Sequence, residues 1–151
     1  MRLELDDFDR NIIQKLEEDG RMPFSQIAEE LGISNTMVHK RFDKLRRRRV
    51  IRNIIPILNE RRLGYGYGAF TGITLDKEHK TQQVIEKLKM IPEVTECHYV
   101  AGGFTLYLRI FAKDQDDLRR ILYEQIDNIE GVTKTDSMID LGCAFKRNLS
   151  F

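Results

Sequence analysis

The sequence contains only two cysteines and no long apolar run. Cys97 and Cys143 lie far apart and lack the spacing of metal ligands, so we expect two reduced, packed thiols instead of a disulfide or a metal site. No apolar run approaches the roughly 20 residues that cross a bilayer, and the N-terminus MRLELDDFDR has no apolar signal core. These absences predict a cytoplasmic protein without a membrane partner.

The signatures of common catalytic sites are also missing. The three histidines, His39, His79 and His98, fall in separate predicted elements, and the chain has no HExxH, GxSxG or Cys-His signature. No glycine-rich phosphate loop opens a helix. We therefore predict no enzyme activity, no catalytic residue, no metal ion and no bound cofactor. We interpret His39 as a DNA contact or a solvated side chain, and His98 as a strand packing residue.

Positive charge is concentrated in one stretch, although the whole chain has a net charge of only +1. Residues 34–62 hold ten Lys and Arg residues against two acids, Asp43 and Glu60. A run of charge is usually only a solvated face, and that alternative stays open. Here the run lies on and after a short helix with a polar face, which favours a helix that reads DNA.

This helix begins after Ser34, whose hydroxyl can accept a backbone N–H at the helix start. Val38, Phe42 and Leu45 follow at i, i+4 and i+7 and predict one buried face. Four arginines at 46–49 extend the cationic surface beyond the helix. Side chains on its other faces can donate hydrogen bonds to base edges and phosphates: Asn35, Thr36, His39, Lys40, Arg41 and Lys44.

Two further helical patterns precede it. Phe8, Ile12 and Leu16 form an apolar stripe at helical spacing. A second helix is predicted over 24–31, ended by Gly32. Two helices separated by a glycine-containing turn, the second with a polar face, are typical of a helix-turn-helix. An ordinary three-helix bundle is the alternative, and it would need no basic outer face.

The next segment predicts a connection between two domains. β-branched and apolar residues at 50–51 and 54–58 favour short strands, with Pro56 suited to a sheet edge. Residues 59–68, NERRLGYGYG, are rich in glycine, which is typical of a flexible link or of strand bulges. We predict a helix-turn-helix domain at 1–52, a strand and hinge linker at 53–67, and a second domain at 68–151.

The second domain alternates strand and helix patterns. Strands are predicted over 69–75, 94–100, 104–111 and 132–141, and helices over 78–90 and 114–128. The order βαββαβ is the split ferredoxin-like arrangement. The predicted fold class is therefore α+β, with a winged-type helix-turn-helix followed by a ferredoxin-like domain. Its sheet would carry both helices on one face, and self-association is the simplest cover for the other.

Several segments resemble the leucine-responsive/asparagine regulator family (Lrp/AsnC, the feast/famine regulators). LDDFDRNIIQKLEEDGR, IAEELGIS and VHKRFDKL are similar to its N-terminal signature, and LGYGYGAF, PEVTECHYVAGGF, LRIFAKD and EGVTKTDSMI to its C-terminal ligand-sensing domain. The resemblance covers nearly the whole chain. It implies a transcriptional regulator that binds double-stranded DNA, dimerises through the C-terminal domain and assembles into tetramers, octamers or larger rings. An amino acid or related metabolite would bind between the dimers.

The resemblance also implies positions for both sites. The family's DNA-contacting region matches the turn and helix residues Ser34, Asn35, Thr36, His39, Lys40 and Arg41, to which we add the neighbouring cations Lys44 and Arg47. The family's effector-binding turn matches Gly102, Gly103, Phe104 and Thr105. Thr135 and Ser137 lie where they can close that pocket from a neighbouring subunit.

Two departures from the family's pattern affect these expectations. The effector turn of the family commonly has the sequence Gly-Asp-aromatic-Asp. Here Gly103 and Thr105 replace the two residues that carry carboxylates. A carboxylate could pair with the ammonium group of an amino acid. An effector-independent protein that wraps DNA is therefore the alternative function. Arg49 replaces the glycine that usually ends the recognition helix, and the extra arginines should strengthen phosphate binding.

Overall fold

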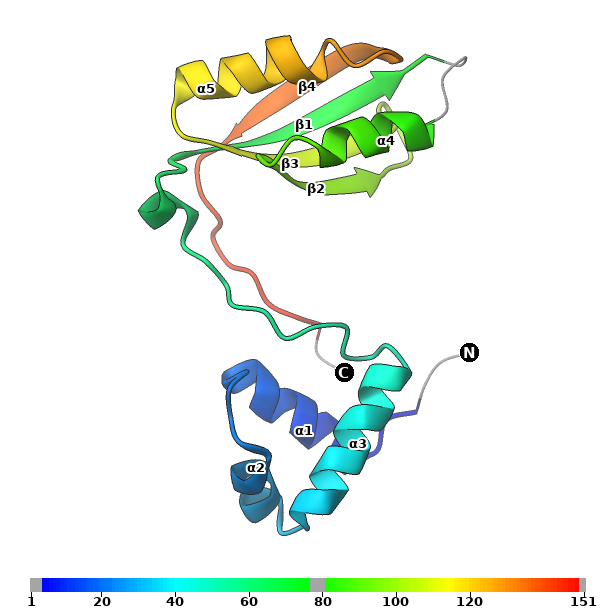
Figure 1. The fold of residues 1–151 in the computed structure, drawn as a ribbon, viewed down its shortest axis with the longest axis vertical. Helices are drawn as coiled ribbons and strands as arrows, with labels where there is room; N and C mark the ends of the chain where they lie inside the picture. Colours follow the sequence, from blue (N-terminus) through cyan, green and yellow to red (C-terminus); the bar gives the residue numbers. More distant parts are fainter. Residues whose placement is uncertain (1–3, 77–80, 150–151) are drawn as a thin grey trace. The chain divides into compact units, whose positions relative to one another are not determined.

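The computed structural model describes residues 4–76 and 81–149, which belong to two compact units. The first unit covers the residues up to Leu58 together with Leu149, and the second covers Asn59–Asn148. Figure 1 labels the elements of both in chain order. Within the described residues, no helix is both long enough and apolar enough to span a membrane. His79 and the predicted helix start at Glu78 lie outside the described residues.

The first unit contains three helices: α1 (Asp7–Glu18), α2 (Phe24–Leu31) and α3 (Asn35–Arg47). Asp6 caps α1 by accepting the backbone N–H of Asp9, and Ser34 caps α3 by accepting that of Met37. α2 ends at Gly32, which adopts the left-handed conformation with φ 64°. These observations confirm the predicted helix-turn-helix. Its core is formed by one or more residues from each helix: Ile12, Ile27, Ala28 and Val38.

The strands predicted at 50–51 and 54–58 are wrong, so the described part of the first unit has no wing. The backbone at 53–58 is irregular and joins no sheet of the described chain. β-branched composition favours extended backbone, but a strand also needs a neighbour that satisfies its N–H and C=O groups. A short helical turn, η1 (Glu60–Leu63), follows this segment.

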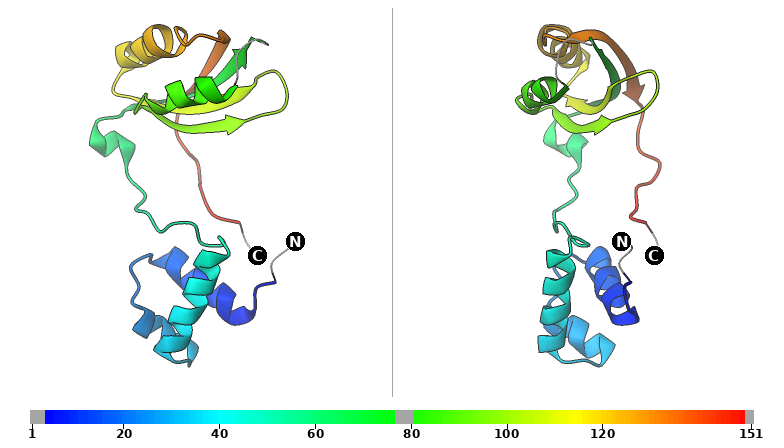
Figure 2. Two further views of the ribbon diagram at one scale, coloured as in Figure 1. Left: turned by 45° about the vertical axis from the view of Figure 1, so that its right-hand side comes forward. Right: turned by 90° about the vertical axis from the view of Figure 1, so that its right-hand side faces the viewer.

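The second unit is a four-stranded antiparallel sheet with two helical segments. Its elements are β1 (Tyr67–Leu75), α4 (Thr81–Lys89), β2 (Val94–Tyr99), β3 (Leu106–Ala112), α5 (Gln115–Arg120), η2 (Ile121–Ile126) and β4 (Val132–Asp140). η2 continues α5 with π-helical winding. The strand order β2-β3-β1-β4 confirms the ferredoxin-like βαββαβ arrangement. Both helices cover the same face of the sheet (Figure 2).

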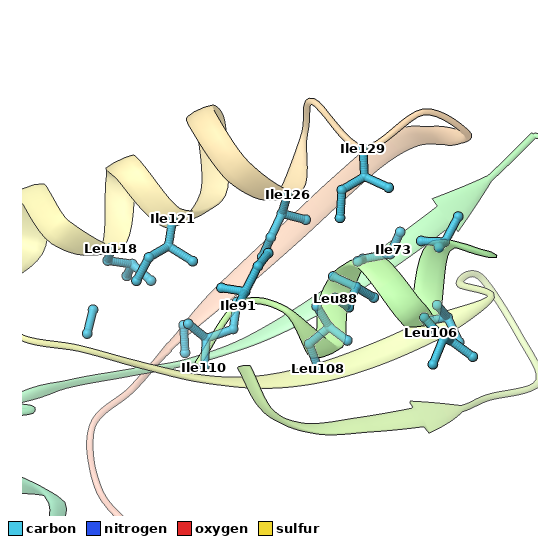
Figure 3. Packing of buried hydrophobic residues seen from close by; sticks show 14 residues of the cluster. Ile73, Leu88, Ile91, Leu106, Leu108, Ile110, Leu118, Ile121, Ile126 and Ile129 are labelled. Atoms are coloured by element: carbon cyan, nitrogen blue, oxygen red, sulfur yellow. The ribbon is translucent and has the colours of Figure 1, made fainter. Parts of the chain in front are cut away.

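The core of the second unit lies between these helices and the sheet. β3 alternates between fully buried and partly exposed residues, which places Leu106, Leu108 and Ile110 against the helices. Leu88 of α4 and Ile121 at the start of η2 pack onto them (Figure 3). The alternate residues of β1 and β3 form the opposite face, which none of the described helices of this unit covers (Figure 2).

Neither cysteine is packed as expected. Cys97 and Cys143 are both free thiols, and both are exposed. Cys97 lies on β2, which is an edge strand of the sheet, and Cys143 follows β4. The expectation of packing is wrong because neither an edge strand nor the segment after the last strand is enclosed on all sides.

Candidate nucleic-acid interface and effector turn

The face of α3 opposite its core residues presents a polar stripe. Val38 and Leu45 of this helix are buried. Because an α-helix repeats every 3.6 residues, a set of residues spaced by four, three and four positions shares the opposite face. This set is exposed throughout: Thr36, Lys40, Asp43 and Arg47. Three of the four belong to the predicted DNA-binding set. The fourth residue is Asp43. Counting charges along the sequence includes this acid but does not show that its carboxylate lies in the middle of the stripe.

Two further predicted contacts, Asn35 and His39, flank this stripe. Both are exposed, and the ring of His39 packs edge-on against Phe24 of α2, with 4.7 Å between the ring centroids. Ser34 precedes them, and its hydroxyl oxygen accepts the N–H of Met37 at 3.2 Å. Ser34 and Asn35 therefore mark the N-terminal end of α3, where the helix dipole favours an anion such as phosphate.

Arg41 lies on the side of α3 that contacts α1. Its Nη1 is 2.6 Å from Oδ2 of Asp6 and 2.8 Å from Oδ1 of Asp9, and the Asp9 side chain is buried. The guanidinium also lies over the ring of Phe8, 5.1 Å from the ring centroid. The bond from Arg41 holds the pKa of the Asp6 carboxyl below its usual value. These contacts hold Arg41 within its own domain, and its role as a DNA contact stays a prediction.

Lys44 lies near the buried Asp9 carboxylate and is also partly exposed to solvent. Its Nζ lies 3.5 Å from Oδ2 of Asp9, an oxygen with no hydrogen-bond partner in the described chain. The Lys44 side chain is nevertheless 40% exposed, so its ammonium group can also reach solvent. Beyond it, the four arginines at 46–49 are all exposed. The cationic surface predicted from the sequence is therefore present over the last turn of α3 and the two residues that follow it.

The predicted effector turn connects β2 to β3 and is anchored to β1. The backbone N–H of Thr105 donates to the carbonyl of Ile73 at 2.8 Å, and the Thr105 hydroxyl accepts the N–H of Leu75 at 3.5 Å. Gly102 has φ 139°, a conformation that other residues rarely adopt. Gly103 and Gly102 are both exposed. The turn depends on glycine for its path and offers no ionisable side chain to a ligand.

Phe104 leaves this turn and lies against Gly72 on the open face of the sheet. A Cβ atom on Gly72 would stand 2.5 Å from the Phe104 ring, so this contact requires glycine. Tyr107 packs beside the ring, with 6.3 Å between the ring centroids. The aromatic residue of the predicted effector turn is thus part of the sheet surface.

Thr135 and Ser137 of β4 lie on the side of the sheet that the helices cover. Their partners across β1 are Ile73 and Thr71, which are both buried. The Thr135 hydroxyl donates to Oδ1 of Asp127 at 2.8 Å, and the hydroxyls of Ser137 and Thr71 are 2.9 Å apart. The described chain therefore does not bring these two residues together with Phe104 in one pocket.

The open face also carries an ion pair that the sequence analysis missed. The guanidinium of Arg109 lies between the rings of Phe70 and Phe111, 4.2 and 4.6 Å from their centroids. It pairs with Asp140 of β4, and both side chains are largely buried. The bond from Arg109 holds the pKa of the Asp140 carboxyl below its usual value. Strand alternation in LYLRIFA could have placed Arg109 on this face, but its partner comes from another strand.

Both structural units match known domain families. The Lrp/AsnC ligand binding domain model matches residues 68–146, and the AsnC-type helix-turn-helix domain model matches residues 5–46. The chain belongs to the Lrp/AsnC family. It is therefore a DNA-binding transcriptional regulator and not an enzyme. Each matched range falls within one of the two compact units.

Relatives match this Lrp/AsnC chain over almost its full length. It is 34% identical to the HTH-type transcriptional regulator FL11 of Pyrococcus furiosus, across 93% of this chain and 92% of the relative. The solved structure of E. coli AsnC has a TM-score of 0.90 at 26% identity, covering 97% of this chain and 99% of that one. A feast or famine regulatory protein from M. tuberculosis, solved in complex with L-methionine, has a TM-score of 0.88 at 28% identity, with the same coverage.

Proposed function

We propose that this Lrp/AsnC regulator reads specific DNA sites with the polar stripe and the N-terminal end of α3. Thr36, Lys40 and Arg47 face the duplex, and Asn35 and His39 contact base edges beside them. Ser34 and Lys44 complete the interface at its margins. The main support for this proposal is that the stripe is exposed while the opposite side of the same helix is buried. Residues 1–52 then bind DNA, 53–67 connect the domains, and 68–151 assemble the oligomer.

Equilibrium binding of the full chain tests this interface. The probes are a duplex with the sequence upstream of its own gene and a random duplex of equal length. Lys40→Ala and Arg47→Ala should weaken both complexes and lower their salt dependence, because phosphate contacts carry no sequence information. Asn35→Ala should weaken the specific complex more. Lys87→Ala removes an exposed charge of α4 and is the matched control. Unchanged binding by a Lys40→Ala, Arg47→Ala double variant would exclude the stripe.

We further propose that two copies meet through their open sheet faces. Each face presents the rings of Phe70, Tyr107 and Phe111 around the Arg109–Asp140 pair. Clustered aromatic side chains and arginine are typical of protein–protein contacts. Dimers assembled into tetramers or octamers follow from the family resemblance. A light-scattering mass of a stable monomer, unchanged over a range of concentrations, would contradict this assembly.

An amino acid or related small molecule is the proposed effector, bound between dimers at the turn 102–105. The support is the L-methionine in the similar structure from M. tuberculosis. Thr135 and Ser137 of a neighbouring copy would close the site, because one copy does not form it alone. The test is light-scattering mass and DNA affinity with and without a panel of amino acids. A shift with one of them supports this effector.

A second candidate is an effector-independent regulator that wraps DNA on its oligomer. Gly103 and Thr105 supply no carboxylate for an ammonium group, and the Phe104 ring is occupied by its contact with Gly72. An unchanged mass and an unchanged DNA affinity across the whole panel would favour this candidate.

A further inference from the structure

The recognition helix α3 ends on a strained residue. Arg49 has φ 56° and is the one non-glycine residue with positive φ in the described chain. The conformation is fixed by two hydrogen bonds that turn the chain out of the helix: the N–H of Arg49 donates to the carbonyl of Arg46, and the N–H of Val50 donates to that of Leu45, both at 2.9 Å. This pair of bonds is the Schellman motif, whose left-handed position is usually glycine.

The same chain uses glycine at two comparable positions. Gly32 follows α2 with φ 64°, and Gly64 follows η1 with φ 92°. A Cβ atom at either glycine would have no neighbour within 4 Å, so backbone conformation and not space favours glycine there. A residue with a side chain loses stability in this conformation. Among the described helices, only α3 ends on such a residue.

Nothing within the described chain offsets this loss. Arg49 is exposed, and its side chain makes no hydrogen bond, ion pair or ring contact with a described residue. A cation near a helix C-terminus is favourable, but the last turn of α3 already contains Lys44, Arg46 and Arg47. Another arginine there adds repulsion between like charges. The fold alone would therefore be more stable with glycine at this position.

We propose that Arg49 is a DNA-contacting residue that binds a backbone phosphate beside the duplex segment read by α3. Strain of this kind persists where a function requires the side chain. Arg48 and Arg49 follow directly after Arg47, the last residue of the polar stripe, so the phosphate backbone of the same duplex is the polyanion within reach. This inference rests on the proposed DNA-binding face of α3 and adds a residue beyond the recognition helix.

Three substitutions in the full chain separate charge from strain. Arg49→Gly removes both, Arg49→Gln removes the charge and keeps the strain, and Arg49→Lys keeps both. The measurements are affinity for a random duplex across a range of salt concentrations, amide hydrogen exchange across α3, and light-scattering mass. A random duplex suffices because a phosphate contact is independent of sequence.

We expect Arg49→Gly and Arg49→Gln to weaken binding about eightfold per DNA-bound copy at 0.1 M salt. The same loss should flatten the slope of log affinity against log salt by about 0.9 per copy. Arg49→Lys should retain most of the affinity. Arg49→Gly alone should slow amide exchange in α3 by about fivefold, because relief of the strain stabilises the folded helix. Stability and DNA affinity would thus change in opposite directions.

Three results would overturn the inference while the proposed interface survived. Wild-type protein and Arg49→Gly could bind with the same affinity and the same salt slope. Alternatively, Arg49→Gly could fail to slow exchange in α3, which would show that the arginine carries no conformational cost. Loss of affinity in Arg49→Gly together with a changed oligomer mass would also count against a direct phosphate contact. If the wild-type chain bound no duplex at all, the proposed function itself would fail.

Discussion

Nη1 of Arg41 on the recognition helix lies 2.8 Å from Oδ1 of Asp9, a carboxylate of α1 that is 1% exposed. Asp6, the N-cap of the same helix, accepts from the same nitrogen. A buried carboxylate is costly unless it is paired. Arg41 therefore joins the recognition helix to the first turn of α1, and this contact helps to fix the orientation of α3 within its domain.

Arg41→Ala should destabilise the helical unit by about 3 kcal/mol, because it leaves the Asp9 carboxylate buried with only Lys44 nearby. The chain has two compact units, so a local measurement is needed in place of one global unfolding curve. Amide hydrogen exchange should accelerate in α1 and α3 and stay constant in the sheet of the second unit. DNA affinity should fall mainly through loss of the folded helical unit.

Arg46→Ala is the matched control for this variant, because Arg46 is an exposed arginine of the same helix. The amide hydrogen exchange rates of Arg46→Ala should equal those of the wild-type protein. Unchanged exchange in Arg41→Ala, together with a loss of DNA affinity and a reduced salt slope, would support Arg41 as a phosphate contact and contradict the structural role.

The Asp6 carboxyl provides a titration test of the same contact. Its pKa is lowered first by the bond from Arg41 and then by the backbone N–H of Asp9. A carboxyl whose folded pKa is lowered contributes stability above its ordinary pKa of about 3.9, and this stability is lost as the pH falls through the lowered folded value. In Arg41→Gln, the Asp6 pKa should rise toward the ordinary value, and the acid-dependent loss of stability should shrink. Carboxyl NMR titration of both proteins measures this, and equal Asp6 pKa values would contradict the assignment.

Local patterns in the sequence were sufficient to predict most of the elements. Ser34 begins α3 as an N-cap and Gly32 ends α2 as a C-cap, as capping chemistry requires. The alternation of apolar residues in β3 predicted which face of this strand is buried. The strands expected at 50–58 failed because a strand is defined by its partner, which local composition does not supply. The contact of Arg41 with α1 could not be predicted for a related reason. Its spacing is compatible with either the edge of a polar face or a contact with α1, and only the acids of α1 decide between them.

The candidate effector site depended even more on contacts distant in sequence. The turn 102–105 was located from the family resemblance, but the contact of Phe104 with Gly72 joins this turn to β1, and no short motif connects the two. Arg109 and Asp140 likewise come from different strands. A closed ligand site needs a second copy in this proposal, so no pattern within one chain could define its walls.

Gly72→Ala should disrupt the contact between the effector turn and the open face. The added methyl group would stand 2.5 Å from the Phe104 ring, and overpacking of this kind costs about 2 kcal/mol. Amide exchange in β1 and β3 should therefore accelerate. Phe104→Ala in the Gly72→Ala background should reverse most of the effect, since the clash then disappears. Additive losses in the double variant would show that the two residues are not coupled.

Asp43→Asn should strengthen DNA binding. Asp43 lies on the exposed stripe between Lys40 and Arg47. In the proposed interface, its carboxylate faces the phosphates of a bound duplex. Repulsion between exposed unit charges is worth about 1 kcal/mol, so affinity for a random duplex should rise about fivefold at low salt. The gain should shrink at high salt as screening increases. Glu124→Gln removes one exposed negative charge from the second unit and should leave the affinity unchanged. A weaker complex with the specific duplex alone would instead show that Asp43 accepts a hydrogen bond from a base, as acidic side chains do from cytosine.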